Sequence, residues 1–300
     1  MSTESLAGKV VVITGASSGI GKGTAQKYAA AGAFVVLAAR RDNLLEELAK
    51  QCESNGGKAL AVHTDVSIQS DVENLTQMTL STFGRIDIWI NNAGGAALGL
   101  FEEIPLADHV RVIETDLLGT LYGSHFALNQ FKKQGSGILI NVASVIGKIP
   151  APYFNSYAAA KHGVVGLSAA IRQELEVNKI KGIRVCTVMP TSMDTPFFDH
   201  AADYTGHKVV PIPPVYEPEQ VVNTLFSLAT DPRDEIAVGG AGGGTGFVLM
   251  HQILPGLMEH MMAKLTHTTL IEKSPPAPDT QGSLNEPVSA GTGVSGGFKQ

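Results

Sequence analysis

Short apolar runs recur along the first 240 residues of the chain, and segments with helical spacing of apolar positions lie between them. The run from Lys9 to Thr14 (K-V-V-V-I-T) places four apolar residues in succession, which predicts a strand buried on both faces. Leu44, Leu45 and Leu48 share one face of a later segment, which predicts a helix with Asp42 as its N-cap. These two patterns predict strands at 9–14, 34–39, 59–63, 86–91, 137–142, 183–188 and 236–238. They predict one helix that ends at residue 31 and another that starts after residue 42. Four further helices are predicted at 68–82, 110–131, 156–177 and 218–229.

Strands and helices alternate throughout this region, so each strand is joined to the next by a helix. Such alternation produces parallel strands connected by right-handed crossovers. The sequence therefore predicts an α/β fold with a doubly wound, parallel, seven-stranded sheet and helices on both faces. Residues 1–240 would form this single domain.

The remainder of the chain has a different pattern. Pro255 would kink a helix whose apolar positions recur at 247, 250, 254, 257, 261 and 265. We expect a helical extension, residues 241–272, packed on the domain. The glycine-dense stretch Val238–Gly246 fits no phosphate-binding pattern and is expected to be a flexible loop. From residue 274 onward Pro, Gly, Ser and Thr dominate, which predicts a disordered tail over 273–300.

Composition narrows the class of protein. The chain has 22 basic and 28 acidic residues, a net charge of −6 and no cluster of Lys and Arg, so no nucleic-acid partner is expected. Cys52 and Cys186 form no C-x-x-C pair, and the nine histidines form no H-E-x-x-H or Cys/His group, so we expect neither a disulfide framework nor a metal. Residues 1–8 lack the charged and apolar regions of a signal peptide, and no run of about 18 apolar residues occurs. We expect a cytoplasmic protein without a spanning segment.

A glycine-rich turn follows the first strand. Residues 15–21 read G-A-S-S-G-I-G and lead directly into a predicted helix. Glycines there let the chain turn tightly and bring backbone N–H groups close to a phosphate, while the helix N-terminus adds partial positive charge. A glycine-rich turn can also be purely structural, but its place between the first strand and the first helix favours phosphate binding.

Tyr157 and Lys161 are the main candidates for chemistry. They lie four residues apart in a predicted helix, so their side chains share one face. A cation beside a phenol favours the phenolate, lowering a pKa that is about 10 when free, and such a phenol can donate or accept a proton. Ser144 follows the fifth strand, where its hydroxyl can bind the oxygen that receives this proton. A Tyr and a Lys at this spacing also occur by chance on surface helices.

Together these motifs resemble the short-chain dehydrogenase/reductase family. The chain has T-G-A-S-S-G-I-G from Thr14, N-N-A-G from Asn91, then Ser144 and Y-x-x-x-K from Tyr157, in the order and spacing of that family over about four-fifths of its length. The resemblance implies a Rossmann-type catalytic domain and a nicotinamide-dependent oxidoreductase. It implies that Tyr157 is the acid/base and that Ser144 orients the carbonyl. It also implies that Lys161 lowers the Tyr157 pKa and binds the nicotinamide ribose.

We also expect a cofactor site and a defined set of partners. The residues expected to hold the cofactor are Gly15, Ser17, Ser18, Gly19, Ile20, Gly21, Arg40, Arg41, Asp65, Val66, Asn92, Ala93, Gly94, Tyr157, Lys161, Pro190, Met193 and Thr195. The partner would be a small-molecule carbonyl or alcohol substrate, and the protein would assemble as a homo-dimer or homo-tetramer.

Two positions depart from the family pattern. The family usually has an Asn on the helix between the fourth and fifth strands, where it steadies a water in a proton relay, whereas T-D-L-L-G-T places Asp116 there. An ionised Asp donates no hydrogen bond, so the effect of Asp116 on the relay is left open, although we count it among the catalytic residues. The family's Pro-Gly after the sixth strand is Pro190-Thr191 in this chain.

The end of the second strand bears on the choice of cofactor. NAD-preferring Rossmann folds carry an acidic residue there for the ribose 2′-hydroxyl, whereas this chain has Ala39 followed by Arg40. A guanidinium suits a 2′-phosphate, and Arg41 or Lys22 adds charge, although all three can also be ordinary surface cations. The sequence therefore predicts NADP(H) in preference to NAD(H).

The side chains expected around the reacting group are mostly apolar. They are Leu98, Leu100, Ile146, Phe154, Met189, Met193, Phe197 and Phe198, about half of which we expect to be core instead. Lys161 and Lys148 are the cations in these flanks, so an uncharged, largely apolar carbonyl compound is predicted. The segment 193–214 would close over it as a lid.

Two other functions share parts of this pattern. A dinucleotide-binding regulator or scaffold with no chemistry would not need Tyr157 and Lys161, which are both present. The G-x-x-x-G-x-G spacing and modest length argue against a sugar-nucleotide epimerase. The predicted function is thus NADP(H)-dependent interconversion of a carbonyl and an alcohol.

Overall fold

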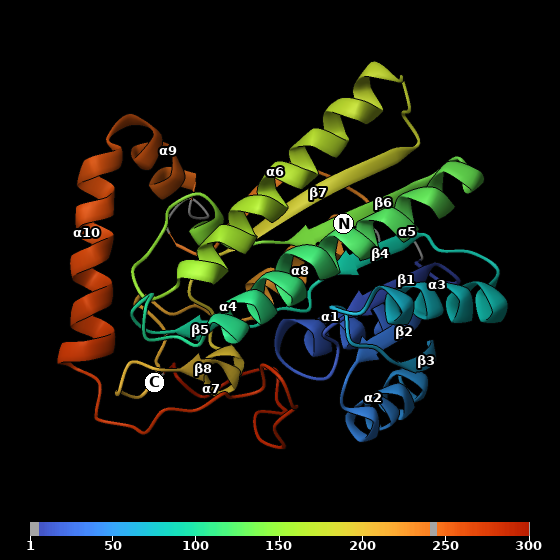
Figure 1. Ribbon diagram of the computed structural model, residues 1–300. Helices are drawn as coiled ribbons and strands as arrows, with labels where there is room; N and C mark the ends of the chain where they lie inside the picture. The colour runs from blue at the N-terminus through green and yellow to red at the C-terminus, as the bar shows by residue number, and fades with distance from the viewer. Residues whose placement is uncertain (1–5, 241–244, 300) are drawn as a thin grey trace.

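The computed structural model describes residues 6–240 and 245–299. Within them, seven parallel strands form one sheet in the order β3-β2-β1-β4-β6-β7-β9 (Figure 1). The strands are β1 (Val10–Thr14), β2 (Phe34–Ala39), β3 (Lys58–His63), β4 (Ile88–Asn91), β6 (Gly137–Val142), β7 (Ile183–Pro190) and β9 (Glu235–Val238). The chain first winds outward from β1 to β3 and then in the other direction from β4, which confirms the predicted doubly wound α/β fold. Expectations for residues 1–5 and 241–244 fall outside the described residues.

Alternate residues of each strand enter two separate cores. In β1, Val11 and Ile13 join one cluster while Val10 and Val12 join the other, as the alternation of side chains along a strand requires. Both clusters are buried because helices cover both faces of the sheet. The first is covered by α1 (Gly19–Ala30), α2 (Asp42–Ser54) and α8 (Glu219–Ser227), and the second by α3 (Gln69–Phe83), α5 (Gly119–Gln134) and α6 (Asn155–Val177).

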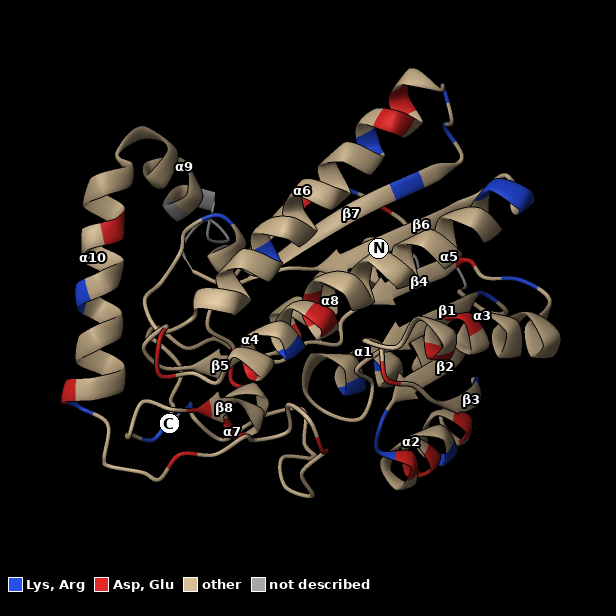
Figure 2. Cartoon of the chain, in the orientation of Figure 1, with Lys and Arg blue, Asp and Glu red and all other residues tan. Residues whose placement is uncertain are grey.

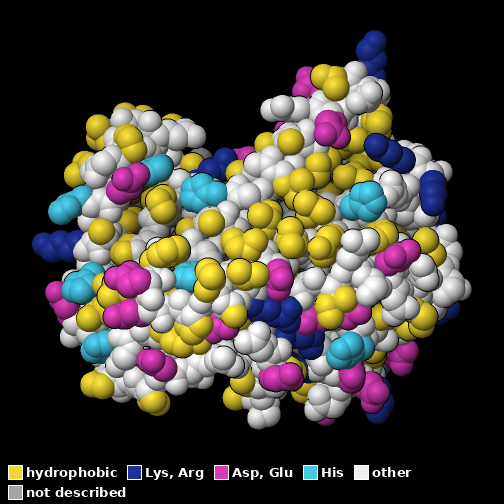
Figure 3. All heavy atoms as spheres, in the orientation of Figure 1, with side chains coloured by type: hydrophobic (Ala, Val, Ile, Leu, Met, Phe, Trp, Pro, Cys, Tyr) yellow, Lys and Arg dark blue, Asp and Glu magenta, His cyan; other side chains and the backbone are white. Residues whose placement is uncertain are grey.

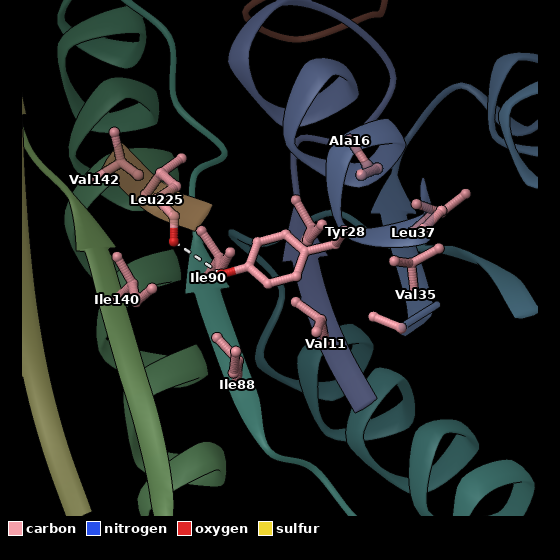
Figure 4. Close-up of a cluster of buried hydrophobic side chains, with 14 of the residues drawn as sticks. Val11, Ala16, Tyr28, Val35, Leu37, Ile88, Ile90, Ile140, Val142 and Leu225 are labelled. Carbon is pink, nitrogen blue, oxygen red and sulfur yellow. Dashed lines mark hydrogen bonds between the residues drawn. The ribbon is translucent and has the colours of Figure 1, made fainter. Parts of the chain in front are cut away.

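Two buried polar groups are satisfied inside these cores. The Tyr28 hydroxyl of α1 donates to the Leu225 carbonyl oxygen of α8 at 2.8 Å, which ties the two helices together over the sheet (Figure 4). On the other face, the fully buried Trp89 of β4 donates its indole N–H to Asn91 Oδ1 at 2.7 Å. Asn91 in turn donates to Asn141 Oδ1 of β6 at 2.9 Å. Polar side chains therefore join neighbouring strands just before their carboxyl ends.

Two helices differ in detail from the prediction. Arg41, not Asp42, is the N-cap of α2, and Asp42 lies in the first turn, where a negative charge still favours the helix N-terminus. The predicted helix 110–131 is divided into α4 (Leu106–Ile113), a π-helical turn (Glu114–Leu118) and α5. Single π-turns are frequent at functional sites, and this one contains Asp116.

The small elements near the site form a second layer above the sheet. A short ladder pairs β5 (Ala97–Leu98) with β8 (Ala202–Asp203), and the single turn α7 (Phe197–His200) precedes β8. Neither element was predicted, because two-residue strands leave no periodic pattern in the sequence. In Figure 2 the charged residues lie mainly on helices and loops around this layer and the sheet.

The C-terminal extension is a pair of helices and not one kinked helix. They are α9 (Thr245–Ile253) and α10 (Pro255–His267), and Pro255 begins the second, where its missing N–H is not needed. Met258 is buried, but the described side chains that were predicted to pack inward are exposed, from 40% for Leu265 to 53% for Leu257. In Figure 3 hydrophobic side chains are exposed over α9 and α10 among His and charged side chains. The Phe247 side chain lies outside the described part of the structure.

The tail differs most from the prediction. Residues 273–300 were expected to be disordered, yet the structure places 273–299 against the domain. The tail leaves α10 and runs beneath β8 and α7 (Figure 1), then across α1, where Gly293 O accepts a hydrogen bond from the Gly19 N–H. We call residues 280–298 the C-terminal strap. No helix in the described ranges combines the length and the apolar character needed to cross a membrane.

Candidate active site

A cavity of about 400 Å³ lies at the carboxyl ends of the central strands. This is the edge of a doubly wound sheet at which ligands bind, beside the point where the strand order reverses. The reversal occurs here between β1 and β4. The cavity extends from Arg40 and Asp65, past Tyr157, to Phe198. It therefore runs continuously from the carboxyl ends of β2 and β3 to α6 and beyond.

Ser144, Tyr157 and Lys161 come together in this cavity. Ser144 ends the loop after β6, where its Oγ accepts a hydrogen bond from the Ile146 N–H at 3.2 Å. Tyr157 and Lys161 lie one turn apart in α6, and Lys161 Nζ lies 5.4 Å from the centroid of the Tyr157 ring. Lys161 Nζ also donates to the Val142 carbonyl oxygen of β6 at 3.2 Å. The lysine is thus held between α6 and β6, the strand that Ser144 follows.

The pKa of Tyr157 is raised, whereas the sequence predicted a lowered one. Burial of the phenol raises the pKa, and the charge of Asp116 raises it further; Lys161 and a hydrogen bond with Ser144 lower it without offsetting the burial. The prediction was wrong in its net direction because it considered the neighbouring cation and not the desolvation of the phenolate. Tyr157 is therefore a protonated donor at neutral pH in this state.

Asp116 forms a buried ion pair with Lys161. Its Oδ1 lies 2.8 Å from Lys161 Nζ, and its side chain is 0% exposed. Oδ2 accepts a hydrogen bond from the Gly95 N–H at 2.9 Å, while Oδ1 has no well-aligned hydrogen bond among the described residues. Burial raises the pKa of the carboxyl, whereas the carboxylate raises the pKa of Lys161 against the opposing effect of burial. Asp116 thus acts on Lys161 from behind the cavity wall.

At two of its glycines, Gly15 and Gly21, the glycine-rich turn leaves no room for a side chain, as a dinucleotide cradle requires. A Cβ on Gly15, which has φ +67°, would lie 2.8 Å from Ala93 Cα, and one on Gly21 would lie 2.2 Å from the Gly15 carbonyl oxygen. A Cβ on Gly94 would lie 2.7 Å from Asp116 Oδ1. The residues present therefore fit a dinucleotide whose phosphates approach the backbone between β1 and α1.

The structure brings most of the predicted cofactor residues to the cavity wall. The residues that line it are Gly15, Ser17, Ser18, Gly19, Ile20, Arg40, Arg41, Asp65, Val66, Asn92, Ala93, Gly94, Tyr157, Lys161, Pro190, Met193 and Thr195. Gly21 lies behind this wall, where it supports the turn by its contact with Gly15.

The end of the cavity beside β2 and β3 is rich in guanidinium groups. Arg41 donates to the hydroxyls of Ser17 and Ser18, at 2.9 Å and 2.8 Å. Asp65 is paired with Arg111 of α4 at 2.5 Å. Burial would raise the pKa of Asp65, but hydrogen bonds from Ser67 and Arg111 lower it below its ordinary value. Sequence reasoning missed Arg111, because nothing in the order of residues along α4 indicates that it reaches β3.

The other end of the cavity is largely apolar. Of the side chains predicted there, those that line it are Ile146, Phe154, Met193, Phe197 and Phe198. Leu98 and Met189 belong to the core, and Leu100 is 46% exposed. Lys148 is paired with Glu235 at 3.1 Å. The Lys148 ammonium group is therefore already paired with a carboxylate of β9.

Two walls of this end come from outside the predicted set. Met262 and Leu265 of α10 line the cavity, as do Ile212 and Pro214 from the segment 193–214. The sequence placed that segment over the substrate as a lid but assigned α10 to general packing. Met at helical spacing is common in ordinary cores. The sequence therefore did not indicate that α10 lines the cavity.

Comparisons with known proteins agree with this geometry. The model of the family described as short chain dehydrogenase matches residues 9–204. An uncharacterized oxidoreductase of Bacillus subtilis (YxnA) is 32% identical over 288 residues, covering 95% of this chain and 79% of that protein. A 3β-hydroxysteroid dehydrogenase of Eggerthella lenta is 35% identical, covering 76% of this chain and 89% of its own.

Similar proteins include a 3-oxoacyl-[acyl-carrier-protein] reductase of Thermotoga maritima, which is 32% identical and covers 80% of this chain and 98% of its own. A crystal structure of a short-chain type dehydrogenase/reductase from Mycobacterium marinum superposes with a TM-score of 0.70 at 30% identity, covering 80% of this chain and 96% of that one. The family match, the sequence relatives and the shared fold agree with the motifs around Ser144 and Tyr157. The chain therefore belongs to the short-chain dehydrogenase/reductase family, and is an oxidoreductase of the CH–OH/C=O type that uses a nicotinamide dinucleotide.

Proposed function

We propose that the protein is an NADP(H)-dependent oxidoreductase that interconverts a carbonyl and an alcohol on an uncharged, largely apolar substrate. The observation that carries the proposal is one continuous cavity with three chemically distinct regions. Ser144, Tyr157 and Lys161 lie in its middle, Arg40 and Arg41 lie at one end, and aromatic and aliphatic side chains line the other.

The middle of the cavity carries the proton chemistry. A nicotinamide dinucleotide bound there supplies a hydride for reduction and takes one up in oxidation. The Ser144 hydroxyl holds the substrate oxygen, and the Tyr157 hydroxyl donates a proton to that oxygen during reduction and takes it back during oxidation. Lys161 Nζ stabilises the phenolate that reduction leaves on Tyr157, because it lies 5.4 Å from the ring centroid. The aromatic rings of Phe154 and Phe197, which both contact Tyr157, keep water from the reacting atoms.

Arg40 and Arg41 support the preference for NADP(H). Both guanidinium groups line the end of the cavity beside β2, where an NAD-preferring fold carries a carboxylate for the ribose 2′-hydroxyl. Their planar forks match a 2′-phosphate in charge and geometry. Asp65, the nearby carboxylate, is already paired with Arg111.

The apolar end supports an uncharged substrate. Phe197 and Phe198 pack against each other at 5.3 Å between ring centroids, and Phe197 contacts the Tyr157 ring at 5.5 Å. A carboxylate on the substrate would lose its hydration against these rings without gaining a fixed cation. Met262 on the facing helix adapts its shape to varied ligands.

A two-by-two assay tests cofactor and substrate class together. Reduction of a neutral ketone and of its carboxylated analogue is followed with NADPH and with NADH. We expect the highest kcat/KM for the neutral ketone with NADPH. A higher value for the carboxylated compound would contradict the apolar pocket, and equal values for the two cofactors would contradict the role of the arginines.

The variant Tyr157→Phe separates an enzyme from a regulator that only binds dinucleotide. Turnover should fall by about 10²–10⁴-fold, the usual contribution of a general acid, while cofactor binding measured by calorimetry stays within about twofold of wild type, since the ring and Lys161 remain. Turnover above about a tenth of wild type would remove Tyr157 from the mechanism. Ser144→Ala should lose less, because the proton donor remains in place.

A further inference from the structure

The C-terminal strap uses the same donors that the proposed cofactor would need. Arg40 Nη1 donates to the carbonyl oxygens of Leu284 and Asn285 at 3.2 Å and 2.8 Å, and Nη2 donates to the Ser283 carbonyl oxygen. Arg111 adds a hydrogen bond to the Leu284 carbonyl oxygen at 3.2 Å. The guanidinium at the end of β2 is thus engaged by three consecutive backbone carbonyls.

The strap also reaches the phosphate-binding turn. The Gly19 N–H at the start of α1 donates to the Gly293 carbonyl oxygen at 2.8 Å. Lys22 Nζ donates to the Thr292 carbonyl oxygen at 3.0 Å. Arg41 Nη1 donates to the carbonyl oxygens of Val288 and Ala290, each at 3.3 Å. Carbonyl oxygens of the strap therefore lie where the oxygens of a dinucleotide's phosphates would be expected.

Further contacts anchor the strap on both sides of the cavity. Leu284 is 5% exposed and belongs to the core cluster above the sheet. Near the C-terminus, Asp194 accepts hydrogen bonds from the Ser295 hydroxyl at 2.7 Å and the Phe298 N–H at 2.8 Å. Burial would raise the pKa of Asp194, but these hydrogen bonds lower it, so the anchor is ionised at neutral pH. The segment 283–293 is held between these two anchors.

We propose that the C-terminal strap is an intramolecular competitor for the phosphates of the cofactor, and that NADP(H) binding releases residues 283–293 from Arg40 and Arg41. The proposal rests on the NADP(H) preference proposed above. A phosphate carries charge and can pair with a guanidinium through two parallel hydrogen bonds, so it adds a Coulombic attraction that a neutral carbonyl lacks. The 2′-phosphate can therefore take Arg40 from three carbonyls, whereas the 2′-hydroxyl of NAD(H) carries no charge with which to do so.

This competition makes the strap a determinant of cofactor affinity. A ligand whose site is available in only a fraction of the molecules binds with an apparent affinity reduced by that fraction. The docked strap should thus weaken every ligand that needs Arg40, and the 2′-phosphate needs it most. Ligands that lack this phosphate should respond less to release of the strap.

Two glycines of the strap provide a matched pair of variants. Gly291 has φ +66°, and a Cβ there would lie 2.4 Å from His200 Nε2 and 2.9 Å from Pro196 Cβ. Gly297 has φ +76°, and a Cβ there would meet nothing within 4 Å. Valine at either position brings the same backbone strain, but only Gly291→Val pushes the strap away from the cavity. Both changes are made in the full chain, and neither removes a group that contacts the cofactor site.

The probes are 2′,5′-ADP, which carries the 2′-phosphate, and 5′-AMP, which does not, with binding measured by calorimetry. We expect Gly291→Val to bind 2′,5′-ADP about tenfold more tightly than wild type does, because the site of the 2′-phosphate becomes fully available. The gain for 5′-AMP should be smaller, because this probe lacks the 2′-phosphate. Gly297→Val should bind both probes as wild type does. If Gly291→Val and wild type bind 2′,5′-ADP equally, the strap does not compete. If neither protein prefers 2′,5′-ADP to 5′-AMP, the proposed NADP(H) preference is wrong instead.

Hydrogen exchange in the wild-type protein gives a second readout that needs no variant. The Ser283 N–H donates to the His200 carbonyl oxygen at 2.8 Å and the Leu284 N–H to the Gln281 carbonyl oxygen at 3.1 Å, so both amides are protected while the strap is docked. Addition of 2′,5′-ADP should accelerate exchange in the peptide that covers 280–293, and 5′-AMP should do so less. Unchanged or slower exchange with 2′,5′-ADP would overturn the proposal, because the strap would then stay in place or close over the ligand.

Discussion

At the scale of single residues, the carboxylate of Asp116 sets the electrostatics of the site. It lies 2.8 Å from Lys161 Nζ in a fully buried position, so its charge acts through protein and not through water. It raises the pKa of Lys161 and adds to the rise in the pKa of Tyr157 caused by burial. Asp116 thereby favours the charged form of Lys161, and it offsets part of the lowering of the Tyr157 pKa that Lys161 causes.

The variant Asp116→Asn should shift the pH profile and spare most of the turnover. Without the carboxylate the phenolate is less disfavoured, so the Tyr157 pKa falls. In the proposed mechanism, reduction needs protonated Tyr157 and is lost as the pH rises through the Tyr157 pKa, so in the variant the loss should begin at a lower pH than in wild type. Oxidation needs the phenolate and should gain activity at correspondingly lower pH. The measurement is kcat/KM against pH in both directions.

Asp87→Asn is the matched control for this variant. Asp87 is also a buried, ion-paired carboxylate, held by Lys9 and Arg85, but it precedes β4 at the opposite end of the sheet. The substitution Asp87→Asn should lower the stability of the protein and leave the pH profile of kcat/KM unchanged. An unshifted profile in Asp116→Asn would remove the electrostatic role of Asp116, and loss of all turnover would mean that the site requires a carboxylate.

At the scale of elements, the turn between β1 and α1 depends on close contact between backbones. Gly21→Ala would bring a Cβ to 2.2 Å from the Gly15 carbonyl oxygen, so the turn must open. We expect a loss of dinucleotide affinity of at least about tenfold and of stability by about 1–3 kcal/mol, as in overpacked cores. Calorimetric titration and urea unfolding measure the two effects.

Gly166→Ala in α6 is the control, because a Cβ there meets nothing within 4 Å. The same exchange in an open helical position should raise the free energy of unfolding by about 0.5–1 kcal/mol. Similar losses of affinity in both variants would show that the turn tolerates a methyl group and that the contact with Gly15 is not required.

The elements with strong periodicity are those that the sequence predicted. Helix α6 was expected at 156–177 and is observed at Asn155–Val177, and the strand expected at 9–14 is observed as β1 (Val10–Thr14). Periodicity did not predict the π-turn at Glu114–Leu118, because its apolar positions fit an unbroken helix equally well. Tyr157 and Lys161 were found because their spacing within one helix is a local property. Arg111 was not found, since its partner Asp65 is brought to it only by the fold.

At the scale of the whole molecule, the apolar end of the cavity is completed by α10, which follows the last strand of the sheet in the chain. Met262 of α10 lines the cavity, while its neighbour Met261 is 52% exposed. Met262→Lys should lower kcat/KM for a neutral ketone by about tenfold or more, because the ammonium group keeps its water and blocks the apolar wall. The carboxylated analogue should lose less, since it gains a cation.

Met261→Lys places the same charge on the outer face of α10 and should leave both substrates unaffected. Steady-state kinetics on the matched pair of substrates provides the comparison. Equal losses in the two variants would mean that α10 acts through its overall stability and that its inner face does not contact the substrate.

The tail shows what composition cannot predict. Pro, Gly, Ser and Thr supply few apolar side chains, which favours disorder, and only Leu284 of the strap enters a core cluster. Beside the anchor on Asp194, the strap is held largely by its backbone carbonyls, and every residue type carries such a carbonyl. Its partners Lys22, Arg40 and Arg41 lie more than two hundred residues earlier in the chain. Such pairing leaves no trace in the sequence of the tail.

The buried position of Trp89 gives the protein a built-in optical reporter. It is the single tryptophan of the chain, it is 0% exposed, and its indole N–H is hydrogen-bonded within the sheet. Its emission therefore has the short wavelength of an indole in an apolar environment and moves to longer wavelength only when the sheet itself opens. Movement of the strap, which lies at the far edge of the cavity, leaves this emission unchanged. Fluorescence thus separates unfolding of the domain from any rearrangement of its C-terminus.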